Sequence, residues 1–202
     1  MDESSTRGPE YAARLAASTA PRRGWRRWLD PQRPYRWNIR RLHLGRVLDV
    51  GCGTGRNLAH LDGNGVGVDH NETAVEIARS RGLRAYTTTD FASSPDAVAH
   101  SFDTVLFAHV LEHMTVDEAT SLVREHLPFV RSGGRVVVIC PQQRGQRSDP
   151  THVTFMPPSV IHAILADVGV RIERTASFPL PAIAGTWFTH NETIVVGRTP
   201  EQ

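Results

Sequence analysis

Lysine is absent from the sequence, and all 23 basic residues are arginine. This absence excludes two classes of enzyme, because P-loop proteins place a lysine against phosphates and pyridoxal phosphate enzymes need a lysine for their Schiff base. Cysteine is scarce as well. The two residues, Cys52 and Cys140, are too few for a disulfide framework and lack metal-ligand spacing, so we expect reduced thiols.

Long apolar runs are also missing. No run approaches the roughly 18 to 20 residues that span a bilayer, and the N-terminus lacks a basic stretch followed by an apolar one. We therefore expect a cytoplasmic protein without a membrane span. The formal net charge of +2 is too small to favour a nucleic-acid partner, although the pI of about 8.8 leaves one open.

The composition is typical of a globular protein with a single core, since 40% of the 202 residues are hydrophobic and 22% are charged. Residues 1–33 differ from the rest, because arginines there are interleaved with Trp25 and Trp28. We interpret this segment either as a flexible or helical arm on the domain, or as a lid or basic arm that faces the substrate. Residues 34–202 are expected to form the domain itself.

From Arg46 onward, strand-like runs alternate with helical patterns, as in βα units on a parallel sheet. Two of the helical patterns follow N-cap residues, Asn71 and Thr115, and we expect Gly82 and the pair Gly133–Gly134 to end them. The predicted fold is α/β, a doubly wound, mostly parallel sheet of seven strands with an antiparallel last strand. The expected strands are Arg46–Val50, Gly65–Asp69, Arg84–Thr87, Asp103–Ala108, Arg135–Cys140, Val170–Ser177 and Glu192–Gly197, and the expected helices include Glu72–Ser80, Val116–Phe129 and Pro158–Val168.

A glycine loop follows the first strand, in the run Val47–Asn57 with the sequence VLDVGCGTGRN. A strand that leads through such a loop into a helix brings backbone amides close to a ligand. The dinucleotide-binding pattern Gly-x-Gly-x-x-Gly would need its third glycine at position 56, where Arg56 stands. The loop therefore argues against a nicotinamide cofactor.

Acidic residues occur at or just after three successive predicted strand ends, namely Asp49, Asp69 and Asp90. Asp69 lies 18 residues after the first glycine of the loop, Gly51, where an acid can bind both ribose hydroxyls. A crevice lined by three acids suits a ribose, an adenine amino group and a positively charged sulfonium, whereas it would repel a pyrophosphate.

With these motifs the sequence resembles the class I S-adenosylmethionine (SAM) dependent methyltransferases over Tyr35 to Val196. The glycine loop, the strand end Gly67–Asp69, the acid in Thr89–Phe91 and the segment Ala108–His113 occur in the family's order. The resemblance implies SAM as cofactor and S-adenosylhomocysteine (SAH) as product. The cofactor-binding residues we expect are Asp49, Gly51, Cys52, Gly53, Asn57, Asp69, His70, Asp90, Phe91 and His109.

A candidate metal site follows the fourth predicted strand. His109, Glu112 and His113 are spaced i, i+3 and i+4, and His152 comes from the long loop after the fifth strand. The set resembles the metal sites of the ubiquinone-pathway O-methyltransferases and small-RNA 2′-O-methyltransferases, which carry Glu-x-x-Glu-His, with His109 in place of the first Glu. We expect either that these four residues bind Mg²⁺, or that His113 and His152 act on the substrate as catalytic residues without a metal.

The substrate prediction rests on segments outside the βα core, where aromatic residues such as Phe178 and Trp187 stand beside polar ones. We expect O-methylation of a small hydroxylated molecule, a sugar, glycan or natural product, and note a resemblance to actinobacterial methylmannose polysaccharide methyltransferases. The alternatives are a quinone-precursor O-methyltransferase, an RNA 2′-O-methyltransferase and a non-catalytic SAM-binding module. The sequence also leaves a homodimer open as the oligomeric state.

Overall fold

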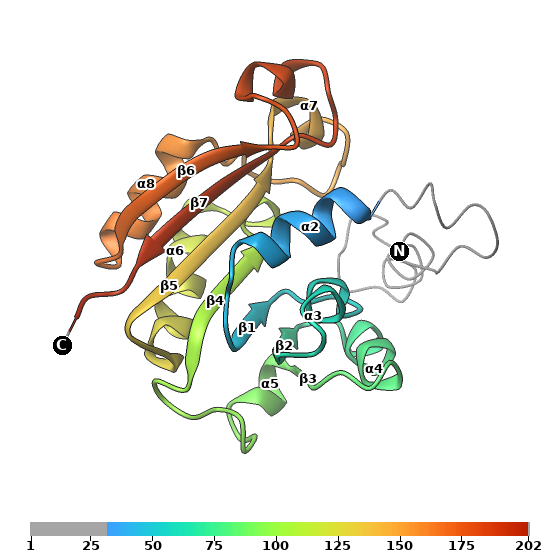
Figure 1. The fold of residues 1–202 in the computed structure, drawn as a ribbon, viewed down its shortest axis with the longest axis vertical. Helices are drawn as coiled ribbons and strands as arrows, with labels where there is room; N and C mark the ends of the chain where they lie inside the picture. Colours follow the sequence, from blue (N-terminus) through green and yellow to red (C-terminus); the bar gives the residue numbers. More distant parts are fainter. Residues whose placement is uncertain (1–31, 202) are drawn as a thin grey trace.

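The computed structural model describes residues 32–201, shown in Figure 1. The arm predicted over residues 1–33 lies outside the described residues except for its last two positions. Among residues 32–201, none of the helices combines the length and the hydrophobicity that crossing a bilayer requires.

A single seven-stranded sheet forms the centre of the molecule, in the order β3-β2-β1-β4-β5-β7-β6. Neighbouring strands from β3 to β5 are parallel, whereas β7 runs antiparallel to both β5 and β6. The predicted doubly wound sheet with an antiparallel last strand is therefore confirmed. The strands are β1 (Val47–Val50), β2 (Gly65–Asp69), β3 (Ala85–Thr87), β4 (Phe102–Ala108), β5 (Val130–Pro141), β6 (Arg171–Phe178) and β7 (Glu192–Arg198).

The central strands are apolar on both faces, because successive side chains of a strand point to opposite sides and both sides are covered. Leu48 and Val50 of β1 belong to one buried cluster, which α6 and α8 cover, and Val47 belongs to a second cluster beneath α2. The covering elements are α2 (Arg33–Arg41), α3 (Arg56–His60), α4 (Glu72–Ser80), α5 (Thr88–Phe91), α6 (Val116–His126) and α8 (Pro158–Asp167), with shorter helices η2 (Leu111–His113), η3 (Leu127–Phe129), α7 (Gln143–Gln146) and η4 (Ala182–Thr186).

Local sequence signals start two of these helices. The Asn71 side chain accepts a hydrogen bond from the backbone N–H of Ala74 at the start of α4. Thr115 and Glu118 form a capping box at the start of α6. Both predicted N-caps are confirmed.

The glycine pair Gly133–Gly134 was expected to end the helix after Thr115, and this prediction is wrong. The helix ends earlier, in the turn η3, and both glycines lie inside β5. Gly133 has a φ of +61°, and a Cβ on Gly134 would stand 2.5 Å from a methyl carbon of Val130. The glycines therefore permit a tight bend at the start of the strand, where β5 changes its register with β4.

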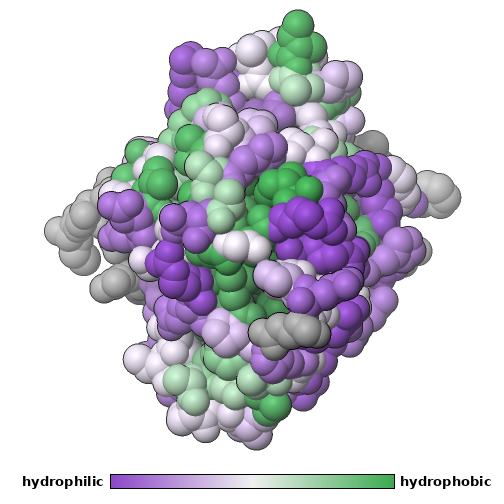
Figure 2. Space-filling model, turned by 90° about the vertical axis from the view of Figure 1, so that its left-hand side faces the viewer, coloured by the Kyte–Doolittle hydropathy of each residue, from purple (hydrophilic) through white to green (hydrophobic). Residues whose placement is uncertain are grey.

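The segment that joins β6 to β7 is much longer than a hairpin turn and closes over the carboxyl end of β5 (Figure 1). A buried amide, Asn191, holds it in place. Its Nδ2 donates to Gln142 Oε1 and Ser177 Oγ, both at 2.9 Å, and its Oδ1 accepts the N–H of Leu180 at 2.9 Å. Ile183 in this segment is 79% exposed. Hydrophobic groups also stand at the surface in the upper part of the face shown in Figure 2.

Replacing Asn191 by alanine should destabilise the protein by at least about 2 kcal/mol, because Gln142 and the N–H of Leu180 would lose buried partners. Urea unfolding measures this loss. The control is Asn64→Ala, whose side chain makes one exposed hydrogen bond to the carbonyl of Gly45. Equal unfolding midpoints for the two variants would contradict the anchoring role of Asn191.

Candidate functional site

The glycine loop after β1 has the backbone that only glycine adopts readily. Gly51, Gly53 and Gly55 have φ angles of +73°, +52° and +79°. A Cβ on Gly51 would also stand 2.2 Å from a methyl carbon of Val110, which follows β4. The loop therefore passes close to the end of β4, and residues of both segments line the same cavity.

Asp69, at the end of β2, fixes this loop. One carboxylate oxygen accepts the N–H of Gly53 at 2.7 Å, and the other accepts the N–H of Asn71 at 2.8 Å. The side chain is nearly buried. Each oxygen has a second lone pair, so the carboxylate can still accept hydrogen bonds from a ligand.

A cavity of about 500 Å³ opens beside Asp69. Most of its polar side chains come from the ends of β2 and β4, whereas much of its wall is aliphatic. The lining residues are Val50, Gly51, Gly53, Val68, Asp69, His70, Asn71, Ala74, Thr88, His109, Val110, His113, Met114 and Leu122.

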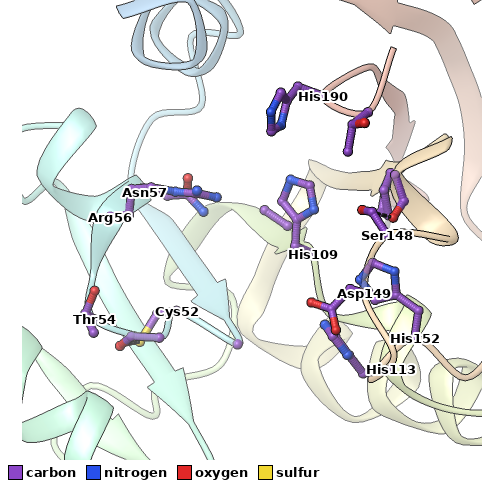
Figure 3. A pocket seen from close by; sticks show the side chains of 16 residues that line it. Cys52, Thr54, Arg56, Asn57, His109, His113, Ser148, Asp149, His152 and His190 are labelled. Atoms are coloured by element: carbon purple, nitrogen blue, oxygen red, sulfur yellow. Dashed lines mark hydrogen bonds between the residues drawn. The ribbon is translucent and has the colours of Figure 1, made fainter. Parts of the chain in front are cut away.

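A smaller cavity of about 300 Å³ lies on the other side of the glycine loop and is mostly lined by polar and ionisable side chains. In Figure 3, Arg56 and Asn57 lie on one side of it, His113 and His152 lie on the opposite side, and His109 lies between them. The two cavities share four lining residues, so they meet at the glycine loop and the end of β4. The shared residues are Gly51, Gly53, His109 and His113.

His109 lies between two buried carboxylates. Its Nε2 is 2.7 Å from an oxygen of Glu192, and its Nδ1 is 3.4 Å from an oxygen of Glu112. Burial by itself lowers the pKa of His109, but the contacts with Glu112 and Glu192 outweigh this effect and raise the pKa to about 9. The ring is therefore an imidazolium at neutral pH, and its φ of +60° is unusual for a residue other than glycine.

Glu112, His113 and His152 form a separate cluster in which one ligand atom from each residue lies within 4.8 Å of the others. Nδ1 of His113 is 3.1 Å from the carbonyl oxygen of Thr151, and Nδ1 of His152 is 3.0 Å from that of Gln146. A nitrogen that faces a carbonyl carries the proton, so Nε2 of each ring keeps a lone pair. Both oxygens of Glu112 are buried without a hydrogen bond of normal geometry within residues 32–201.

Comparison with known proteins identifies the fold and a methyltransferase domain. Residues 48–138, which contain the glycine loop, Asp69 and Glu112, match a family model described as a methyltransferase domain. Residues 48–138 therefore contain a methyltransferase domain, and the sheet around it has the Rossmann-like fold of the SAM-dependent methyltransferases. No protein of curated function matches the sequence.

Solved structures with the same fold include a SAM-dependent methyltransferase from Archaeoglobus fulgidus, at 16% identity and a TM-score of 0.66 over 86% of this chain and 97% of that chain. Magnesium protoporphyrin IX methyltransferase from Synechocystis PCC 6803, with bound SAM, is 18% identical, with a TM-score of 0.64 over 96% of this chain and 93% of that one. A chain from the complex of the Haloferax volcanii Trm112 methyltransferase activator with its methyltransferase is 18% identical, with a TM-score of 0.71 over 98% and 99% of the two chains. At these identities the likeness shows the fold.

The structure of this methyltransferase brings most of the predicted cofactor residues to the two cavities. Gly51, Gly53, Asp69, His70 and His109 line the larger cavity. Cys52 and Asn57 line the smaller one, together with the shared Gly51, Gly53 and His109.

Three predicted cofactor residues line neither cavity. Asp90 lies in α5 with 58% of its side chain exposed, 3.8 Å from Arg79, and Phe91 is buried against Phe129 in the core. Asp49 is wholly buried in β1. Asp49 thus lies within β1, Asp69 ends β2 and Asp90 follows β3, and only Asp69 reaches the cavity wall.

The proposed metal set is also only partly assembled. His113 and His152 lie together with Glu112, whereas His109 lies outside this cluster. Both of its nitrogens face carboxylates, so it offers no lone pair to a metal. Sequence reasoning missed Glu192, the partner of His109, because nothing near the start of the last strand indicates that its side chain meets the end of β4.

The carboxyl of Asp49 is wholly buried, and its pKa is strongly raised. Burial raises its pKa to about 7, against the opposing effects of the Asn57 amide and the Arg56 guanidinium. Neither of its oxygens makes a hydrogen bond of normal geometry within the described residues. A cation bound nearby would stabilise the charged form of this group.

The pKa of Asp49 predicts a pH effect on stability. The folded state binds a proton here up to about pH 7, whereas an unfolded aspartate releases it near 3.8, so native stability falls as the pH rises through this window. Asp49→Asn avoids that loss. The difference in unfolding free energy, variant minus native, should therefore grow between pH 4 and pH 8 by something on the order of 4 kcal/mol.

Urea unfolding across that pH range measures the difference. Asp62→Asn serves as the control, since the Asp62 side chain is 80% exposed. If the Asp49→Asn and native curves stayed parallel with pH, the buried carboxyl would not titrate as described.

Proposed function

We propose that this methyltransferase transfers the methyl group of SAM to a hydroxyl of a small molecule, a sugar or a natural product. The proposal rests on two adjoining cavities that share four lining residues and differ in polarity. The larger cavity, with aliphatic walls and Asp69, suits a nucleoside, and the smaller polar cavity suits a hydroxylated acceptor.

The cofactor side of the proposal rests on Asp69. Its carboxylate is held by two backbone N–H groups and keeps lone pairs toward the larger cavity, where the hydroxyls of a ribose can donate to them. Val110, Met114 and Leu122 supply apolar surface for the base. Bound SAM supplies a methyl group activated by a sulfonium.

The residues shared by both cavities determine where the acceptor meets the cofactor. Gly51 and Gly53 add no side chain there, so two ligands can approach each other across the loop. Holding the acceptor hydroxyl at attack distance lowers the barrier by up to roughly 7 to 11 kcal/mol. His109 contributes a fixed ring at this junction, because both of its nitrogens are engaged by carboxylates.

The acceptor hydroxyl must also lose a proton. His113 and His152 present Nε2 lone pairs on the far wall of the smaller cavity, and either can accept that proton, for a rate gain of about 10² to 10⁴. The same two atoms with Glu112 fit a divalent cation. Such an ion, when bound, would lower the pKa of the hydroxyl.

The ligand atoms of Glu112, His113 and His152 also indicate which metal ion fits the cluster. Two imidazole nitrogens and one carboxylate suit Zn²⁺, Fe²⁺ or Mn²⁺, whereas Mg²⁺ prefers oxygen ligands. Each imidazole is oriented by a backbone carbonyl, an arrangement common around metal-bound histidines. We therefore propose a transition-metal ion rather than the Mg²⁺ expected from sequence.

Replacing Asp69 by alanine should raise the Kd for SAH by about 10- to 100-fold, because hydrogen bonds to a charged acceptor are lost. Titration calorimetry measures the change. Asp167→Ala is a matched control, since Asp167 is an exposed aspartate paired with Arg124 far from the cavities. A native protein that binds no SAH would end the proposal, and an unchanged Kd in Asp69→Ala would remove Asp69 from the site.

Metal binding is tested on protein stripped with a chelator and then titrated with Mn²⁺, Zn²⁺ or Mg²⁺ by calorimetry. We expect the native protein to bind Mn²⁺ or Zn²⁺ more tightly than Mg²⁺, and His152→Ala to lose at least about tenfold in affinity. His190→Ala is the control, because His190 lines the same cavity outside the cluster. Full methyl transfer in the chelator, or equal losses in both variants, would contradict a metal at this cluster.

A further inference from the structure

Arg56 lines the smaller cavity and has no salt-bridge partner within residues 32–201, although its charge acts on the buried Asp49 carboxyl. It is the first residue of α3, directly after the glycine loop, and it is partly buried. Within residues 32–201 its guanidinium makes no hydrogen bond or ion pair, whereas Arg46 and Arg79, for example, each pair with an aspartate. An unpaired cation at the wall of a cavity favours an anionic ligand.

The opposite wall of this cavity carries the negative groups. Asp149 accepts the N–H and the hydroxyl of Thr151, at 2.9 Å and 2.7 Å, and these bonds favour its charged form. Glu112 belongs to the same cluster as His113 and His152. The cavity is therefore polarised, with its free positive charge at Arg56 and its proton acceptors and carboxylates across from it (Figure 3).

We propose that Arg56 binds a carboxylate in the smaller cavity, which makes the acceptor a hydroxylated carboxylic acid. This inference rests on the proposed function, because it assigns the smaller cavity to the acceptor. A planar guanidinium matches a carboxylate through two parallel hydrogen bonds, and one guanidinium balances one negative charge. With the carboxylate at Arg56, the hydroxyl of the acid faces the Nε2 atoms of His113 and His152.

The amino-acid end of SAM is a second source of the same chemistry, since it also ends in a carboxylate. Arg56 directly follows the loop that both cavities share, so either carboxylate can reach it. The two sources are separated by ligands that differ only in this group.

The cofactor arm compares SAH with 5′-methylthioadenosine, which lacks the amino-acid end. Calorimetry is run on the native protein, on Arg56→Gln and on Arg144→Gln, which removes an exposed arginine of α7 near the same cavity. If Arg56 binds the cofactor carboxylate, Arg56→Gln weakens SAH about 10- to 100-fold and leaves methylthioadenosine unchanged. Arg144→Gln should bind both ligands as the native protein does.

The acceptor arm uses the matched pair 3,4-dihydroxybenzoate and catechol, titrated into protein saturated with SAH. We expect the native protein to bind the carboxylated member at least about tenfold more tightly, and Arg56→Gln to abolish this preference. Arg56→Lys, which keeps the charge but loses the planar fork, should retain part of it.

Each outcome decides one point. If Arg56→Gln loses only the preference for 3,4-dihydroxybenzoate over catechol, Arg56 binds the carboxylate of the acceptor. If Arg56→Gln loses only affinity for SAH, Arg56 binds the carboxylate of the cofactor, and the proposed acceptor class is wrong. If SAH binds Arg56→Gln normally and the native protein does not prefer the acid, Arg56 is not an anion site. Failure of the native protein to bind either nucleoside would instead remove the proposed function.

Discussion

The two hydrogen bonds from the backbone to Asp69 are the constraint on which the site depends. They join the glycine loop after β1 to the start of α4 after β2, so two segments that leave adjacent parallel strands are held at one sheet edge. The loop could not approach so closely with side chains in place, because a Cβ on Gly51 would meet Val110. Without this link the larger cavity would lose its polar wall, and the two cavities would lose their common border.

A second constraint acts where the cavities meet. His109 sits at the end of β4 with a positive φ, and its ring is held between Glu112 and Glu192. Glu192 begins β7, which the buried amide of Asn191 fixes against the end of β5. Glu192 at the start of β7 thus positions a ring at the end of β4, and that ring lies where the larger cavity meets the smaller polar one.

Much of this fold could be predicted from the sequence, because alternating apolar runs, two N-caps and the strand-end loop are local signals. The same holds for Glu112 and His113, which lie three and four residues beyond His109. Contacts between distant segments left no such signal. The pairing of Glu192 with His109 joins residues 83 apart, and the exposure of Asp90 depends on how α5 packs. Gly133 misled the prediction, since a positive φ serves a bend in a strand as well as the end of a helix.

We propose that the loop held by Asp69 is the binding surface for SAM. Hydrogen exchange of the native protein, followed by mass spectrometry with and without SAH, tests it most directly. We expect slower exchange in peptides that cover residues 51–57 and 69–71, and unchanged exchange across α8 on the far part of the sheet. Exchange at the glycine loop that stays the same with saturating SAH would contradict it.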